Sequence, residues 1–108
     1  MIDLVADLKG KYPNHVVLVE QTFFDIKDGT NKRFYCAYDE DADVVHEVLG
    51  YRLVHTVSGR RCCGPNLHKI RHALLKKGYA VVTYSNNQIS SVMKPEDLES
   101  PWSLREKK

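Results

Sequence analysis

The stretch His15-Val-Val-Leu-Val-Glu20 decides the fold class, together with a second stretch of the same kind, Tyr79-Ala-Val-Val-Thr-Tyr84. Both are short runs rich in apolar, β-branched residues, which is typical of strands buried on both faces of a sheet. Strands of this kind require helices that cover the faces of the sheet. The chain between the two stretches has apolar residues at the spacing of a helix. The sequence therefore predicts a single α/β domain, with a mixed β-sheet of about five to six strands flanked by helices.

Three segments are expected to form helices. Residues 2–10 place apolar side chains along one side of a short amphipathic helix. A second helix begins after Asp39, a residue type suited to an N-cap, and ends at Gly50. A third begins at Pro65-Asn66 and ends at Gly78.

Four further segments are expected to be extended. Residues 23–27 and 33–38 are predicted as two strands joined by the turn Asp28-Gly-Thr-Asn31, a strong hairpin signal. Residues 51–57 are predicted as another strand and residues 89–93 as a short edge strand. Together these elements assign residues 1–93 to the domain. Residues 94–108 are expected to be a charged, proline-containing C-terminal tail, pinned by Trp102.

Composition sets the class of protein. The chain has 108 residues, of which 43% are hydrophobic and 28% charged, as expected for one folded domain. Its longest apolar run is only Val16–Val19, which excludes a membrane-spanning helix, and its start does not resemble a secretory signal. Three cysteines without paired spacing favour a reducing compartment, so we expect a cytoplasmic protein in which Cys36 packs within a strand.

Charge divides the chain into two parts. Residues 1–47 carry ten acidic and five basic side chains, whereas residues 48–95 carry eight basic side chains, three histidines and no acid. A long segment of this kind is a plausible binding surface for a polyanion, although its charges could instead pair with the acidic half across an ordinary surface.

Several motifs, in the same order as in a known family, carry a resemblance that covers about residues 4–88. They are residues 11–27, Tyr38-Asp-Glu-Asp-Ala42, Gly64-Pro65, Leu74-Leu-Lys-Lys-Gly78 and Tyr79-Ala-Val-Val. They resemble the mismatch-recognition domain at the N-terminus of MutS-type DNA mismatch-repair proteins.

The resemblance implies roles for two residues. Phe23 matches the phenylalanine that wedges beside a mispaired base, and Asp25 matches the glutamate that hydrogen-bonds that base. Gln21-Thr22 stands where the family has Gly-Asp, and Asp25 is one methylene shorter than the glutamate. The fold therefore transfers more safely than the activity.

These observations predict a non-enzymatic DNA-binding module for duplex DNA, mismatched or otherwise distorted, without a metal or other cofactor. The common phosphate-loop, zinc-protease and serine-hydrolase motifs are absent from the sequence. Besides DNA, a protein partner or a second copy of the chain is expected, but no membrane. The residues expected to contact DNA are Phe23, Asp25, Arg60, Arg61, Asn66, Lys69, Arg71, Lys76 and Lys77.

Two other functions stay open at the level of sequence. The chain could keep the fold and act as a protein-interaction module without DNA recognition. Asp25 and Lys27 could also form the Asp-x-Lys half of a Mg²⁺-dependent, restriction-type nuclease, which would need a second acid such as Glu20, Asp7 or Asp28. A zinc site is disfavoured, because the adjacent Cys62 and Cys63 are poorly spaced to bind one ion.

Overall fold

Three α-helices, six strands and one short 3₁₀ helix make up residues 2–97, which are the residues that this computed structural model describes. Trp102 and most of the expected tail lie outside the described residues. In chain order the elements are α1 (Ile2–Lys11), β1 (His15–Asp25), β2 (Thr30–Tyr38), α2 (Glu40–Leu49), β3 (Leu53–Thr56), β4 (Gly59–Gly64), α3 (Leu67–Lys76), β5 (Ala80–Ser85), β6 (Gln88–Met93) and η1 (Pro95–Asp97).

The six strands form one mixed sheet in the order β3-β4-β2-β1-β5-β6. β1 and β5 run parallel in the middle of the sheet, with Val17 opposite Val82, and the other neighbouring pairs are antiparallel. The two apolar stretches noted in the sequence are therefore adjacent central strands. The predicted fold class, a single α/β domain with a mixed sheet of up to six strands, is confirmed.

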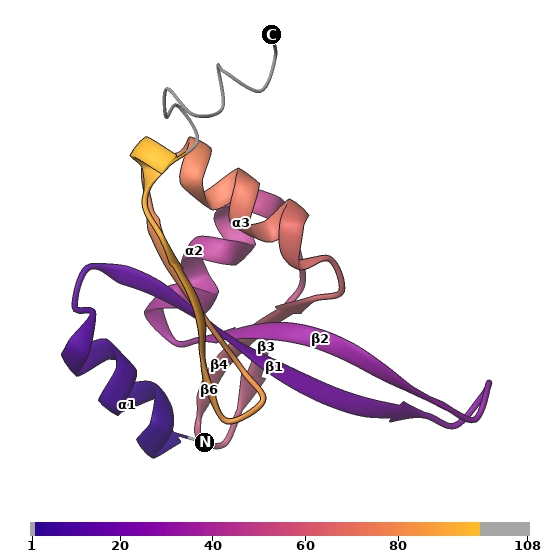
Figure 1. Cartoon of the computed structure of the whole chain (residues 1–108). Helices are drawn as coiled ribbons and strands as arrows, with labels where there is room; N and C mark the ends of the chain where they lie inside the picture. The colour runs from indigo at the N-terminus through magenta and orange to yellow at the C-terminus, as the bar shows by residue number, and fades with distance from the viewer. Residues whose placement is uncertain (1, 98–108) are drawn as a thin grey trace, which may run out of the picture.

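Helices cover the two faces of the sheet unequally (Figure 1). α2 and α3 pack side by side on one face, over a core that contains Leu18, Ile70 and Leu74. α1 packs on the other face through Leu8, over Val17 and the neighbouring apolar side chains. Because α1 has only ten residues, it covers only part of that second face.

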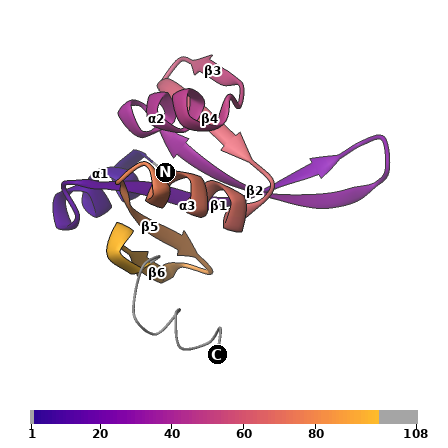
Figure 2. The same cartoon turned by 90° about the horizontal axis from the view of Figure 1, so that it is seen from above.

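The hairpin of β1 and β2 extends well beyond the rest of the sheet (Figures 1 and 2). We call residues 21–34 the arm, because there β1 and β2 pair only with each other, from Gln21 opposite Phe34 to Asp25 opposite Thr30. The sequence prediction of two separate strands within residues 15–27 was wrong. The polar residues at 20–22 keep the extended backbone and the pairing with β2, so one strand of 11 residues runs through them.

β4 is a strand that the sequence analysis did not predict. Its sequence, Gly-Arg-Arg-Cys-Cys-Gly, does not alternate clearly between polar and apolar residues, and it is formed by pairing with β2 and β3. Consequently Arg60 and Arg61 lie within the sheet and not on a loop after the Ser58-Gly59 turn.

The helix ends match the predicted positions, with one difference in mechanism. Gly50 ends α2 in the left-handed conformation, and the Asn66 side chain caps α3 by accepting a hydrogen bond from the Lys69 amide. Asp39 lies at the N-cap of α2, but its side chain does not cap the helix. Its Oδ1 instead accepts a hydrogen bond from the Arg60 amide at 3.1 Å, which ties the start of α2 to β4.

The cysteines also differ from expectation. Cys36 and Cys63 are opposite each other on β2 and β4 and form a disulfide, whereas Cys62 is a buried free thiol. Cys36 therefore does more than pack within a strand, and the cysteines do not support the expected reducing compartment. Among the described residues, no helix has the length and apolar character needed to cross a membrane.

Candidate nucleic-acid interface

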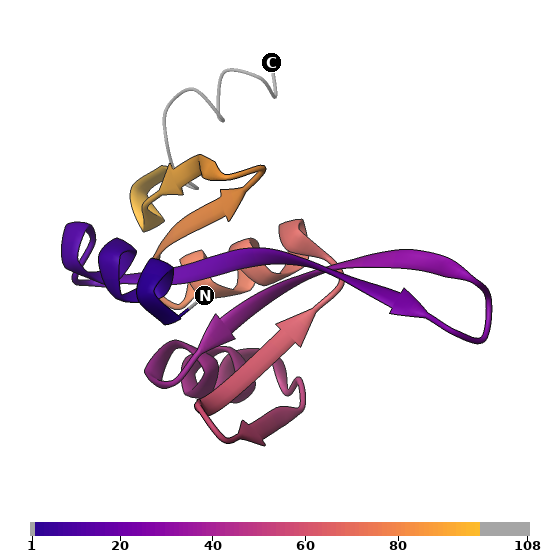
Figure 3. The ribbon, with the colours of Figure 1, turned by 90° about the horizontal axis from the view of Figure 1, so that it is seen from below.

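A part of the α1-side face carries no helix. In the view from below (Figure 3), α1 lies over one end of β1, while β3, β4 and the arm remain uncovered on this side. We call the uncovered area the open face. One cavity of this face, of about 370 Å³, is lined by Phe23, Phe34, Arg52, Val54, Arg61 and Cys63, and we call it the aromatic cavity. A larger cavity, of about 520 Å³, adjoins it at Phe23 and Phe34 and has Asp25, Lys27 and Lys32 in its lining.

The residues of the open face come together through the alternation of side chains along four neighbouring strands. Val17 and Val19 of β1 pack under α1, so Gln21 and Phe23 extend the same face onto the arm. On β3, Leu53 packs toward α2 and α3, which leaves Val54 on the opposite side with Phe23. Strand pairing therefore brings together residues that are up to 40 positions apart, Phe23 and Cys63.

Two rings and a guanidinium form the centre of the open face. The Phe23 and Phe34 rings meet edge to face, with centroids 5.5 Å apart and planes inclined by 70°. The Arg61 guanidinium carbon lies 5.7 Å from the Phe23 ring centroid, which is a cation–π arrangement. Aromatic rings and arginine guanidinium groups stack well with other planar groups. The cluster of Phe23, Phe34 and Arg61 is therefore suited to a planar ligand.

The polar groups of Arg61 are only partly satisfied. Its Nε is buried and has no hydrogen-bond partner among the described residues. No carboxylate is among the described side chains that line the aromatic cavity, whereas the larger cavity beside it includes Asp25 together with Lys27 and Lys32. The positive charges of Arg52 and Arg61 at the aromatic cavity therefore favour an anionic ligand.

A third cavity, of about 310 Å³, adjoins the aromatic cavity at Arg61. Gln21, Tyr38, Thr56 and Ser58 contribute amide and hydroxyl groups to it, and Asp39, whose Oδ1 accepts a hydrogen bond from the Arg60 amide, also lines it. Burial raises the pKa of the Tyr38 phenol, against smaller lowering effects of Arg61 and Gln21, so the hydroxyl is protonated at neutral pH. Arg61 thus lies between an aromatic cavity and a hydroxyl-lined one.

Arg60 has a different environment from Arg61, although the two are adjacent in sequence. It points toward the face covered by α2, and its Nε and Nη2 each donate a hydrogen bond of 2.8 Å to the Asp43 carboxylate. These bonds lower the pKa of Asp43 and raise that of Arg60. The charge of Arg60 is therefore already compensated.

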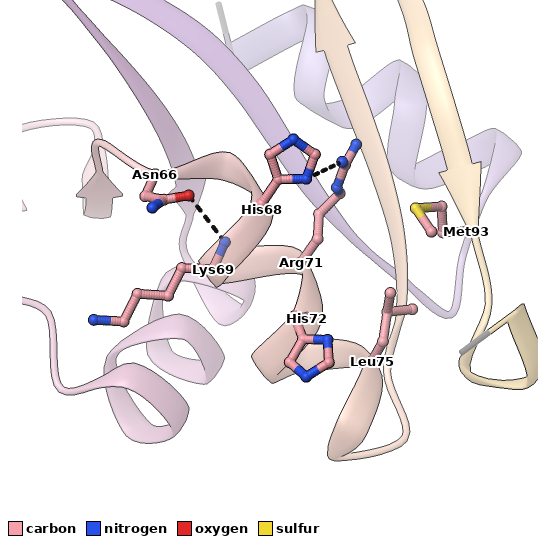
Figure 4. A pocket seen from close by; sticks show the side chains of 7 residues that line it. All are labelled: Asn66, His68, Lys69, Arg71, His72, Leu75 and Met93. Carbon is pink, nitrogen blue, oxygen red and sulfur yellow. Dashed lines mark hydrogen bonds between the residues drawn. The ribbon is translucent and has the colours of Figure 1, made fainter. Parts of the chain in front are cut away.

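The basic residues of α3 form a separate surface (Figure 4). Lys69, Arg71, His68 and His72 line a groove of about 450 Å³ between α3 and Met93 of β6. Arg71 donates hydrogen bonds to Ser91 at 3.3 Å and to Nδ1 of His68 at 3.1 Å, which requires that this ring nitrogen carries no proton.

The predicted DNA contacts therefore do not share one surface. Phe23 and Arg61 lie on the open face. Arg60 and the basic groove of α3 lie on the side covered by helices, where Asn66 is occupied as the N-cap. Lys76 and Lys77 are exposed at the C-terminal end of α3, opposite to the end that Asn66 caps. The residues expected to contact DNA between Arg60 and Lys77 therefore lie on different faces of the sheet.

Asp25 takes part in the turn of the arm. Its Oδ1 accepts a hydrogen bond from the Lys27 amide at 2.9 Å, and its Oδ2 lies 3.9 Å from Nζ of Lys32. Lys32 is closer to Asp28, at 2.9 Å. The carboxylate is thus held near the tip by local contacts, two residues beyond Phe23 on the same strand.

The acids considered for a metal-dependent nuclease are dispersed. Glu20 is on the opposite face of β1 from Asp25 and pairs with Arg33 at 3.0 Å. Within residues 2–97, no group of three or more His, Cys, Asp or Glu side chains is placed to hold a metal ion. Cys63 is occupied by the disulfide, so the Cys62, Cys63, His68 and His72 set is not brought together as a site either.

Phe34, Arg52 and the exposed side of Cys63 belong to the candidate site but were not predicted from the sequence. The alternation within residues 33–38 could have indicated that Phe34 shares a face with Cys36. However, this alternation could not show which strand lies next to β2 and contributes side chains to the same face, because β4 was not predicted from the sequence.

No model of a known protein family matches this chain, and no curated protein matches it significantly in sequence. The resemblance to the MutS mismatch-recognition domain therefore stays a prediction from the motifs.

Proposed function

We propose that this chain is a non-enzymatic DNA-binding module that recognises mismatched or otherwise distorted duplex DNA, in the manner of a MutS-type mismatch-recognition domain. The observation that carries the proposal is the cluster of Phe23, Phe34 and Arg61 on the part of this sheet face that α1 leaves uncovered. A cytoplasmic location belongs to this proposal because of the DNA ligand and not because of the cysteines, two of which form a disulfide.

Phe23 is suited to the role of the wedge. It is 37% exposed, at the base of the arm, and it is supported from the side by the Phe34 ring. Inserting an apolar side chain at a base step costs a few kcal/mol of unstacking, and this cost is smallest where the bases are already mispaired. A wedge of this kind therefore favours distorted DNA.

The cations have two roles in the proposal. Arg52 and Arg61 contact phosphates beside the wedge, because they line the same cavity as Phe23. The basic side chains of α3, on the other side of the sheet, add long-range attraction for DNA and are not needed for the contact itself.

The experiment is a fluorescence-anisotropy titration of a matched duplex and a duplex with one G·T mismatch, at about 50 and about 200 mM salt. Salt-sensitive binding that favours the mismatch, and that Phe23→Ala abolishes, would support the wedge. Binding that is equally salt-sensitive for both duplexes and unchanged by Phe23→Ala would leave only a general DNA-binding domain. Absence of binding at the lower salt would contradict the proposal.

A protein-interaction module is the second candidate, and the tip of the arm favours it. Phe24 is 63% exposed and Ile26 is 86% exposed, both on the arm. Apolar side chains that protrude in this way are common at protein–protein contacts. A second copy of the chain is the simplest partner to test. If sedimentation shows a dimer that Phe24→Ser or Ile26→Ser dissociates, while no DNA binds, this second function is preferred.

A further inference from the structure

We infer that the open face binds the unpaired bases of a single-stranded nucleic-acid segment, with bases stacked on Phe23 and Phe34 and the backbone held by Arg52 and Arg61. This inference rests on the proposed function and specifies the form of nucleic acid at the site. It assigns the Phe34 ring to base stacking and the Arg52 and Arg61 side chains to the backbone of that segment.

The first argument concerns the position of the rings. Phe23 and Phe34 lie at the wall of a cavity, and Phe34 is half-buried, whereas Phe24 protrudes on the other side of the arm. A base inside a well-stacked duplex presents only its edges in the grooves, and its flat face becomes accessible to these rings only where the base step is disrupted. An unpaired base exposes both faces and can be turned out to stack on an aromatic side chain.

The second argument concerns Arg61. Its guanidinium lies over Phe23, and its buried Nε has no partner among the described residues. A planar guanidinium can stack on a base while its N–H groups donate to a base edge or a phosphate. A bound nucleotide would thus supply the acceptor that this donor lacks.

The third argument is the path across the sheet. Arg61 borders both the aromatic cavity and the cavity lined by the Thr56 and Ser58 hydroxyls. A bound strand would stack its bases on the rings and extend its sugar–phosphate chain along Arg61 toward these hydroxyls. The ligand would then follow a continuous track over β1, β2, β4 and β3. Among the described residues, the aromatic cavity has no carboxylate in its lining, and Asp39 of the hydroxyl-lined cavity uses its Oδ1 to accept a hydrogen bond from the Arg60 amide. Arg52 and Arg61 therefore give the track its positive charge.

The test uses three labelled ligands of about 12 nucleotides, within the range that single-strand-binding domains occupy. They are oligothymidine, the same strand paired with oligoadenine, and an abasic strand with the same number of phosphates. We expect oligothymidine to bind on the order of 10-fold more tightly than either other ligand, since each stacked base contributes strongly to affinity.

The variants separate stacking from charge. Phe34→Leu keeps an apolar side chain but removes the ring, and should weaken oligothymidine binding on the order of 10-fold while leaving duplex binding unchanged. Arg61→Lys keeps the charge but removes the planar group, and should lower the preference for oligothymidine over the abasic strand. Phe24→Leu, the same change at a ring that does not line the aromatic cavity, is the comparison variant and should weaken oligothymidine binding less than Phe34→Leu does. Thermal unfolding of each variant shows whether it is folded.

The outcomes distinguish this inference from the proposed function. If the abasic strand binds as tightly as oligothymidine, or if folded Phe34→Leu and Arg61→Lys variants bind oligothymidine normally, the open face is not a stacking site. Salt-sensitive duplex binding would then still support the DNA-binding module. If no ligand binds at about 50 mM salt, the inference is wrong, whereas the proposed function is decided separately by the titration of the G·T-mismatched duplex at the same salt.

Discussion

Lys9 of α1 and Asp41 of α2 form an ion pair of 3.0 Å between helices that lie on opposite faces of the sheet. The other carboxylate oxygen of Asp41 accepts a hydrogen bond from the Val17 amide at 3.1 Å, and Nζ of Lys9 donates to the His15 carbonyl at 2.6 Å. The pair thus joins both helices to the start of β1. Asp41 is only 6% exposed, so its charge depends on these partners.

Removal of Asp41 should destabilise the fold strongly. Asp41→Ala leaves the Lys9 charge and the Val17 amide without their partner, and we expect a loss of about 3 kcal/mol in the free energy of unfolding. Urea denaturation measures this loss. Asp43→Asn, two positions along the same helix but exposed, is the matched control and should cost much less. Equal effects of the two substitutions would show that the buried pair has no special importance.

His15 should make stability depend on pH. Burial lowers the pKa of His15, and the positive charges of Lys94 and Lys9 lower it further. The neutral form is therefore favoured in the folded state. Its contribution to stability is complete above the unfolded-state pKa of about 6.5, and it is lost as the pH falls through the lower pKa of the folded state.

The measurement is the urea midpoint at a series of pH values from about 7.5 down to about 5. His15→Gln cannot be protonated, so its midpoint should fall less than that of the wild type over this range. Parallel profiles of the two proteins would contradict the assignment to His15.

Gly59 should not tolerate a side chain. Its φ of +135° is unfavourable for other residues, and a Cβ atom there would collide with the Asp39 carboxylate that binds the Arg60 amide. We expect Gly59→Ala to cost about 1–3 kcal/mol. Gly10→Ala, within α1 and with open space around the new methyl group, should stabilise the protein by about 0.5–1 kcal/mol. Thermal or urea unfolding compares the two.

The Cys36–Cys63 disulfide should contribute to stability. It closes a segment with a sequence separation of 27 residues, and its reduction should lower the free energy of unfolding by about 2–4 kcal/mol. Urea denaturation with and without a thiol reductant measures this difference. The double variant Cys36→Ala/Cys63→Ala should show no such difference. A reductant effect that persists in it would implicate the remaining Cys62.

Arg60 and Arg61 should differ in their effect on DNA binding. Arg61→Ala removes a cation from the open face and should reduce the slope of log affinity against log salt by about 1. Arg60→Ala should leave the slope close to that of the wild type, because Arg60 is already paired with Asp43. Fluorescence anisotropy over a salt series gives both slopes, and the reverse order would place the contact on the α2 side.

The sequence by itself determined the fold class and most element positions. The central strands around Val17 and Val82, the end of α2 at Gly50 and the cap of α3 at Asn66 were all predicted, because they depend on local apolar runs and on the conformational preferences of single residues. The adjacent Phe23 and Phe34 rings were not predicted, although Phe23 was singled out.

Only the tertiary structure decided which of these side chains meet. β4 exists because β2 and β3 pair with it, and the register of that pairing places Cys63 against Cys36. The same alternation sends Arg61 to the open face and Arg60 toward Asp43, so neighbours in sequence have different environments. Side chains alternate between the faces of a strand, so only the pairing of distant segments fixes which residues come together, and local sequence does not determine that pairing.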